Sequence, residues 1–176
     1  MKHRLCIFIL SLACACALLA VRGVRAAVPP QKDYLSQIEA DKIRDAQTPN
    51  ERITLFLSFA DDRLTKLQYE FDHPSENRHD EMINSLLNAF VGCVDDAADL
   101  IQIGIEKQQN IRKGINLMAA RTKDYLAILQ KLPATGADAE NYKDNLDDAI
   151  EGTQDASREA EDAKKNVAPP PVRRKN

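Results

Sequence analysis

Two histidines beside acidic residues come nearest to a metal-binding pattern in this chain. His73 and His79 flank a turn, and four acidic residues lie close to them along the sequence: Asp72, Glu76, Asp80 and Glu81. Imidazole and carboxylate groups are common metal ligands, so a site at this turn is conceivable. A metal centre in a helical bundle, however, draws its ligands from facing helices that point into the core. We therefore expect solvated side chains here, with no bound metal and no other cofactor.

A lone thiol is the second group that could do chemistry. Cys93 is the single cysteine after residue 26, because Cys6, Cys14 and Cys16 precede it. A reactive thiol needs a nearby base or a lowered pKa. At helical spacing the neighbours of Cys93 are apolar: Leu86, Phe90, Ala97 and Leu100. The sequence therefore predicts a buried structural cysteine, with an intermolecular disulfide as the alternative.

Paired carboxylates for acid–base catalysis would have to come from Asp95, Asp96 and Asp99. Such a pair works only at a defined separation inside a cleft. The sequence indicates neither, and it contains no GxGxxG, GxxxxGK[ST] or HExxH pattern. We predict no catalytic residue and a protein that is not an enzyme.

Acidic residues also form a stripe near the C-terminus. Asp144, Asp148, Glu151 and Asp155 recur at helical spacing and would share one face of a helix. This carboxylate stripe could hold cations loosely or receive a basic partner. It lacks the alternating ligands and central glycine of a calcium loop, so a solvated outer face is the favoured interpretation.

Small residues recur in the central part of the chain and would let helices approach closely. They are Ala97, Ala98, Gly104, Gly114, Ala119 and Ala120. Close packing is the favoured interpretation, and a groove for an apolar ligand or a partner helix is the alternative.

These groups must be positioned by helices, because the composition is poor in glycine and β-branched runs and rich in helix formers. A first helix is expected from after Pro30 to about Gln47. Thr48 can cap a second helix, with Pro49 at its first position and Glu51 as the capping-box acid. Before Pro74 this helix should end. Its predicted core residues are spaced three and four apart: Ile53, Leu57, Ala60, Leu64, Leu67 and Phe71.

The proline-free region 75–132 carries a nearly continuous helical stripe of apolar residues. One unbroken helix would be about 85 Å long. The polar run at 106–110 interrupts the stripe, and we favour a break with reversal there over a single helix. The stripe contains Leu86, Phe90, Cys93, Ala97, Leu100, Gly104, Ile111, Ile115, Met118, Thr122, Leu126 and Leu129.

The C-terminal part should contain a turn at 133–136 and a last helix from about Asp138 to Lys165. Its apolar stripe thins to alanines, so weak packing or fraying is expected in its second half. Residues 27–166 then form an all-α bundle domain of four or five amphipathic helices. Residues 167–176, with three prolines and a basic end, are predicted to be a disordered tail.

The first 26 residues have the layout of a secretory signal peptide. A basic start at Lys2 and Arg4 precedes a charge-free apolar run over 5–21, and small residues at Val24 and Ala26 suit cleavage after Ala26. A lipid-modified cysteine or an uncleaved anchor are the alternatives. We expect an exported protein, periplasmic or extracellular.

Export changes the charge of the chain. The formal net charge is −3, and residues 1–26 hold four basic and no acidic residues, which leaves −7 after cleavage. Five more basic residues lie after Ala163, so the body over 27–163 carries −12. Such a body repels nucleic acid and anionic lipid unless the basic tail at Arg173, Arg174 and Lys175 makes the contact.

Two segments resemble an all-helical domain of unknown function found in exported or membrane-anchored bacterial proteins. Residues 51–64 are similar to its "L-x-x-A-E-x-R-L" helix, and residues 122–132 to its "H-L-x-V-L-x-x-L" segment. The resemblance spans about 48–160, with Tyr125 where that domain often has histidine. It implies a helical extracytoplasmic module and no known catalysis.

The function that these observations favour is an envelope-associated interaction or structural module. It would contact a protein partner, or a second copy of itself, through helix faces. A bundle that binds a small apolar ligand is the alternative, and an enzyme of unknown class is a weaker one. We expect no nucleic-acid partner, and membrane contact only transiently or through an uncleaved N-terminal segment.

Overall fold

The computed structural model describes residues 34–134 and 139–167, and within them the chain is all-helical. The elements are α2 (Gln37–Asp45), α3 (Pro49–Asp72), α4 (His79–Glu106), α5 (Arg112–Leu129), a short 3-10 helix (Ala139–Asn141) and α6 (Lys143–Asn166). The all-α bundle prediction is confirmed. The predicted signal peptide, part of the 133–136 turn and residues 168–176 lie outside the described residues.

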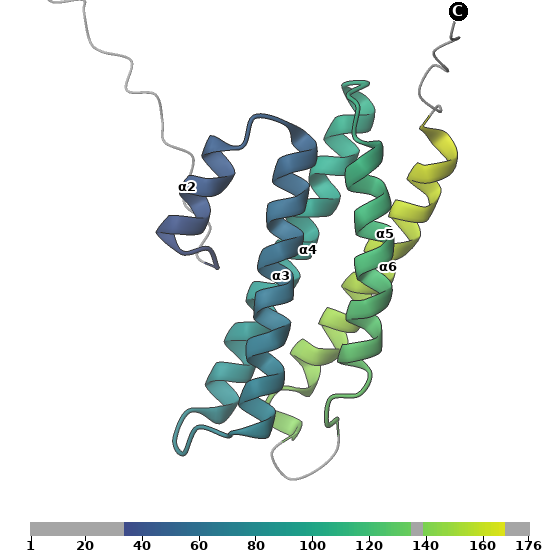
Figure 1. The fold of residues 1–176 in the computed structure, drawn as a ribbon. Coiled ribbons are helices and arrows are strands. Elements are labelled where there is room, and N and C mark those ends of the chain that lie inside the picture. Colours follow the sequence, from purple (N-terminus) through teal and green to yellow (C-terminus); the bar gives the residue numbers. More distant parts are fainter. Residues whose placement is uncertain (1–33, 135–138, 168–176) are drawn as a thin grey trace, which may run out of the picture. The chain divides into compact units, whose positions relative to one another are not determined.

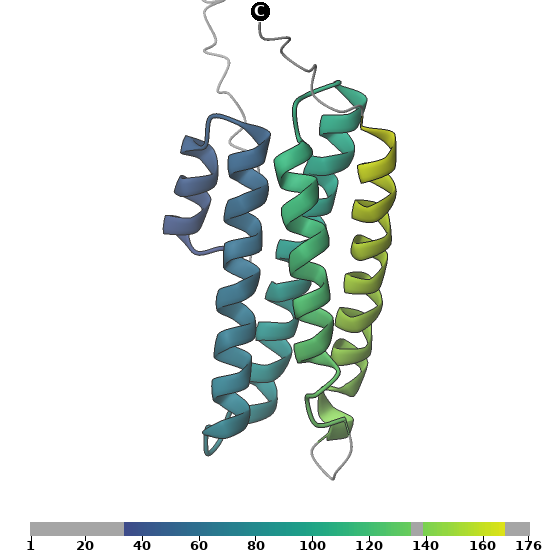
Figure 2. The same cartoon turned by 45° about the vertical axis from the view of Figure 1, so that its right-hand side comes forward.

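Four helices, α3 to α6, form the bundle, and α2 lies against α3 on its outer side (Figures 1 and 2). The hairpin of α3 and α4 and the hairpin of α5 and α6 make the most extensive contacts. The hairpins meet through α4 with α6 and through α3 with α5. Because α4 and α5 have few mutual contacts, the α4–α5 connection crosses the bundle diagonally, and α3 and α5 run parallel.

The start of α3 is set by its capping box. Thr48 Oγ1 accepts from the Glu51 amide at 3.2 Å, and the Glu51 carboxylate accepts from the Thr48 amide at 3.0 Å, with Pro49 opening the helix. At the other end His73 is the C-cap, directly before Pro74. Both predicted boundaries are confirmed.

The predicted break in the central region is also confirmed. α4 ends at Glu106 and α5 begins at Arg112. Between them Gln108 adopts a positive φ of 52°, and the Gln109 amide donates to the Gly104 carbonyl at 2.8 Å. The connection forms here because residues 107–110 are polar and exposed, and a straight helix would carry Ile111 away from the core in which it is now fully buried.

The core follows the predicted stripe closely. Ile53, Leu57, Ala60, Leu64 and Leu67 are buried, whereas Phe71 is half-buried. In the central stripe only Leu100 and Leu126 are half-buried rather than buried. Among the small residues, Ala120 is exposed and Ala98 half-buried, and the other four are buried. Several large core residues lie outside the predicted stripes: Phe56, Phe59, Ile83, Leu87, Val94, Ile101 and Tyr125.

Two predictions about the outer helices need correction. The first helix does not begin after Pro30 but at Gln37, because Ser36 and Glu39 form a capping box that fixes its start, and it ends at Asp45 rather than Gln47. The last helix does not pack weakly in its second half. Its alanines at 156, 160 and 163 are buried, since small side chains let α6 approach its neighbours closely.

The described part of the chain thus ends in an ordered contact. Val167, which the sequence analysis assigns to the tail, is half-buried against the core. None of the described helices is long and apolar enough to span a membrane.

Candidate functional site

The first described segment of the chain lies beside the bundle and is held to it mainly by polar contacts. We call this segment, Tyr34–Ala46, the N-terminal strap; it consists of α2 and the turn before it. α2 has no buried residue, and Ile38 on it is 69% exposed. Leu35, in the turn before α2, is buried in the core, and Tyr34 and Ile43 pack against that core, so the strap has a small apolar anchor beside its polar contacts.

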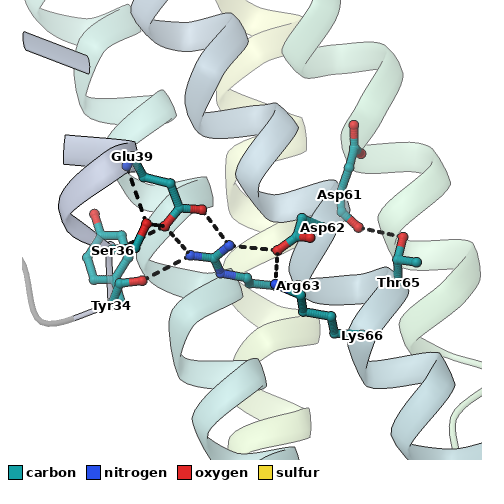
Figure 3. Close-up of polar contacts among 8 residues, drawn as sticks. All are labelled: Tyr34, Ser36, Glu39, Asp61, Asp62, Arg63, Thr65 and Lys66. Atoms are coloured by element: carbon teal, nitrogen blue, oxygen red, sulfur yellow. Dashed lines mark hydrogen bonds and ion pairs between the residues drawn. The ribbon is translucent and has the colours of Figure 1, made fainter. Parts of the chain in front are cut away.

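Arg63 on α3 makes the central contact with the strap (Figure 3). Its two terminal nitrogens donate to the two Glu39 carboxylate oxygens at 2.6 and 2.7 Å, and one of them also donates to the Tyr34 carbonyl at 3.2 Å. The Arg63 side chain is only 10% exposed and that of Glu39 13% exposed. A shielded bidentate pair of this kind is stronger and more directional than a surface ion pair. We call this set of contacts the strap latch.

Glu39 joins the latch to the local structure of the strap. The same carboxylate that binds Arg63 accepts from the Ser36 amide at 2.8 Å and from its hydroxyl at 2.9 Å. The hydrogen bond from Arg63 is the main reason that the pKa of Glu39 falls to about 2. One carboxylate therefore caps α2 and docks it, so the two functions are lost together if the group is removed.

Tyr34 provides the second attachment, on α4. Its hydroxyl donates to the Asp96 carboxylate, and its ring lies over Gly92. A Cβ at Gly92 would be 2.7 Å from the Tyr34 ring, so only glycine leaves room for this contact. Burial raises the pKa of Asp96 to about 6, and the nearby Asp99 charge adds to that effect.

A groove of about 680 Å³ opens beside the strap, between α2 and the first turns of α3 and α5. Ala46, Thr54 and Leu55 contribute apolar surface to it. Lys42 and Lys113 also line it, and neither forms an ion pair within the described residues. Glu51 lines it as well, but its carboxylate is engaged by the amides of Gln47 and Thr48, whereas Asp45 remains available at the edge.

The two histidines close the α3–α4 turn rather than form a site. His79 Nδ1 lies 3.0 Å from the buried Glu70 carboxylate, while the His73 ring stacks on Tyr69 with centroids 4.4 Å apart. Glu70 also accepts from the amide and hydroxyl of Ser75, and the amide bond is the main cause of its lowered pKa. Within the described residues no group of three His, Cys, Asp or Glu side chains is placed to hold a metal ion.

Cys93 is fully buried in the core, as predicted. The three aspartates do not share a site, because Asp95 and Asp99 are exposed and Asp96 is buried under Tyr34. The carboxylate stripe lies outside the core: Asp144, Asp148 and Glu151 are exposed, and Asp155 is half-buried and paired with Arg158.

Tyr125, which stands where the resembled domain often has histidine, is a core residue. Its hydroxyl donates to the Leu57 carbonyl at 2.8 Å, and its ring packs edge-on against Phe90 at 5.3 Å. Burial raises the pKa of this phenol. Tyr125 therefore fastens α5 to α3 and stays protonated.

Sequence reasoning missed the strap latch and its residues. A signal was present: Arg63, Glu70 and Asp96 fall on the core side of their helices, in phase with the apolar residues. Charged residues are rarely buried unless they are paired, so each implied a partner. The identity of that partner could not be obtained from periodicity.

Comparison of the chain with known proteins gives no match to any family model, to any curated protein or to any solved structure. The resemblance to an exported helical domain therefore stays a prediction.

Proposed function

We propose that this protein is an exported, non-enzymatic module of the cell envelope that binds a segment of a partner protein in the groove beside α2. The observation that carries the proposal is an open groove that combines apolar surface from Ala46 and Leu55 with two lysines, Lys42 and Lys113, in its lining. The signal-like N-terminus supplies the expected compartment.

Charge and shape indicate the kind of segment that would fit. Leu55 and Ala46 offer an apolar surface for one or two side chains, and Lys42 and Lys113 offer ammonium groups to acidic residues that flank them. The groove is of a size that takes a short stretch of polypeptide. The proposed partner therefore presents an apolar side chain next to carboxylates.

An apolar ligand inside the bundle is less favoured by the packing. Ile111 occupies the space beside Gly104, where a Cβ would be 2.5 Å from its side chain, and Tyr125 packs against Phe90. An internal ligand would have to lie beside Gly104 or Phe90, and side chains of the protein already fill the space at both positions.

Site-specific photocrosslinking in the producing cell tests the proposal. A photoreactive phenylalanine analogue at Leu55 or Lys113 should yield one discrete adduct with a second protein, and the adduct should weaken when Lys42 is changed to Glu. The matched control places the same analogue at Glu151, on the exposed carboxylate stripe. No adduct from the groove, or an equal adduct from Glu151, would overturn the proposal.

The exported state has its own test. Mass spectrometry of the protein recovered from the producing cell should show an N-terminus at Ala27. A lipidated cysteine, or a retained Met1 in protein recovered with the membrane, would show an anchored module, and a retained Met1 in the cytoplasmic fraction would overturn export.

A further inference from the structure

Basic residues from two distant parts of the sequence meet at one end of the bundle. Lys107, Arg112 and Lys113 come from the α4–α5 connection and the first turn of α5, and Lys164 and Lys165 come from the last turns of α6. Figures 1 and 2 place that connection and the end of α6 at the same end of the bundle. A side-chain hydrogen bond from Arg112 to the Val167 carbonyl fastens the two together. We call these five residues the basic end.

The basic end has a net charge opposite in sign to that of the rest of the described protein. The described residues 106–113 and 161–167 together hold five basic and three acidic residues, a net charge of +2. The other described residues hold eleven basic and twenty-two acidic residues, a net charge of −11. An asymmetry of this size orients a protein in the field of a charged surface.

Several of these charges are not used to stabilise the fold. Lys107 and Lys113 form no ion pair within the described residues, and Arg112 binds a carbonyl rather than a carboxylate. Lys164 and Lys165 pair only with Glu161 and Asp162 on their own helix, at 3.2 and 2.8 Å. Positive residues in the first turn of α5 oppose the helix dipole, and that turn contains no acidic residue. Departures from local folding preference are expected where residues serve binding.

An exposed apolar side chain lies beside the same charges. Ile103, in the last turn of α4, is 41% exposed and precedes Lys107 by one helical turn. Lysines and arginines around an exposed aliphatic residue are typical of protein surfaces that rest on an anionic bilayer. A soluble anionic polymer would use the charges but would gain nothing from Ile103.

We propose that the basic end docks on the surface of an anionic lipid bilayer, with the acidic body directed away from it. Lys113 belongs to both this surface and the groove, but Lys107, Lys164 and Lys165 do not line the groove, so substitutions at those residues test the membrane proposal separately.

Vesicle sedimentation of the purified protein tests the proposal. Vesicles of about 30% phosphatidylglycerol in phosphatidylcholine should retain the protein at low salt, and pure phosphatidylcholine should not. Because electrostatic attraction is screened, retention should fall steeply at about 0.5 M salt. The double substitution Lys107→Glu with Lys165→Glu should weaken partitioning by at least about tenfold.

The matched control reverses two lysines at the opposite end, Lys131→Glu with Lys143→Glu. All four side chains are exposed, so each pair changes the net charge equally with little effect on folding, which circular dichroism can check. The control should retain binding within about twofold. No retention on anionic vesicles, equal retention on neutral ones, or equal loss in the control would overturn the proposal. Crosslinking from Leu55 should be unchanged in both variants.

Discussion

The four-helix core and the N-terminal strap are held by different physical forces. In the core, apolar side chains from α3 to α6 are fully buried, among them Phe90 and Tyr125, whose rings pack at 83° to one another. The strap, in contrast, buries one apolar side chain, Leu35, and otherwise depends on the polar contacts of Arg63 and Asp96 and on the space above Gly92. Apolar burial is additive and tolerant of detail, whereas a polar latch depends on a few groups in one geometry. The strap should therefore be the part of the molecule that single substitutions can release.

The largest effect is expected in the core. Phe90→Ala should lower the free energy of unfolding by about 3–5 kcal/mol, because it removes a buried ring and leaves a cavity. Thermal or urea unfolding should show one cooperative transition at a lower midpoint. A loss below about 1 kcal/mol would show that the core is less tightly packed than we describe.

Breaking the latch should cost less and act locally. Arg63→Met should destabilise the protein by about 2–4 kcal/mol, less than the most severe buried-pair losses, because Glu39 can reach water once the strap moves. Urea unfolding measures this value, and Lys66→Met, which removes only an exposed partner of Asp62, serves as the control. Equal effects of the two substitutions would contradict the latch.

The Asp96 contact should give stability an unusual pH dependence. Its pKa is raised to about 6 from an ordinary 3.8, so the folded state holds a proton that the unfolded state releases between those values. Stability of the wild type should therefore fall as the pH rises from about 4 to about 6. Asp96→Asn cannot titrate, and its stability relative to wild type should increase by about 1–2 kcal/mol over that interval. If the difference in unfolding free energy between Asp96→Asn and wild type does not change over this pH range, the pKa of Asp96 is not raised by burial.

Glu39 should act in the opposite sense and at lower pH. Because its pKa is lowered to about 2, the stability it contributes is present above about 4.5 and is lost as the pH falls toward 2. Glu39→Gln should remove that acid-side loss, which the same unfolding series can measure.

The smallest expected effect compares two glycines, Gly92 on α4 and Gly152 on α6. Gly92→Ala places a methyl group 2.7 Å from the Tyr34 ring and should destabilise the protein by about 1 kcal/mol. Gly152→Ala meets nothing within 4 Å and should instead stabilise α6 by about 0.5–1 kcal/mol. Effects of the same sign at both positions would show that Tyr34 is not seated over Gly92.

The core could be predicted from the sequence, and the strap could not, for reasons visible in particular residues. Ile53, Leu57, Leu64 and Leu67 repeat at the period of a helix, and Thr48 with Glu51 gives a local start signal, so both belong to a short window of sequence. The pairing of Arg63 with Glu39 spans 24 positions and that of Tyr34 with Asp96 spans 62. No local pattern encodes such pairings; they exist only after the helices have packed.

The same limit applies to the candidate surfaces. The basic residues at 107–113 and 164–165 are visible in the sequence, but their meeting at one end depends on how the helices pack. The groove beside α2 likewise requires Lys42 and Lys113, from helices far apart in the chain, to face one space. A stripe of alanines predicts weak packing of α6, because each alanine offers little apolar surface. In the structure the same small side chains allow α6 to approach its neighbours closely.

Hydrogen exchange measured by mass spectrometry on the wild type and on Arg63→Met tests the central distinction between latch and core most directly. We expect the largest gain in exchange rate in Arg63→Met over residues 34–47, with a smaller loss of protection in α4 and α5 that does not exceed the loss of global stability measured by urea unfolding. A loss of protection in α4 to α6 as large as that in the strap, or no change in the strap, would contradict the account.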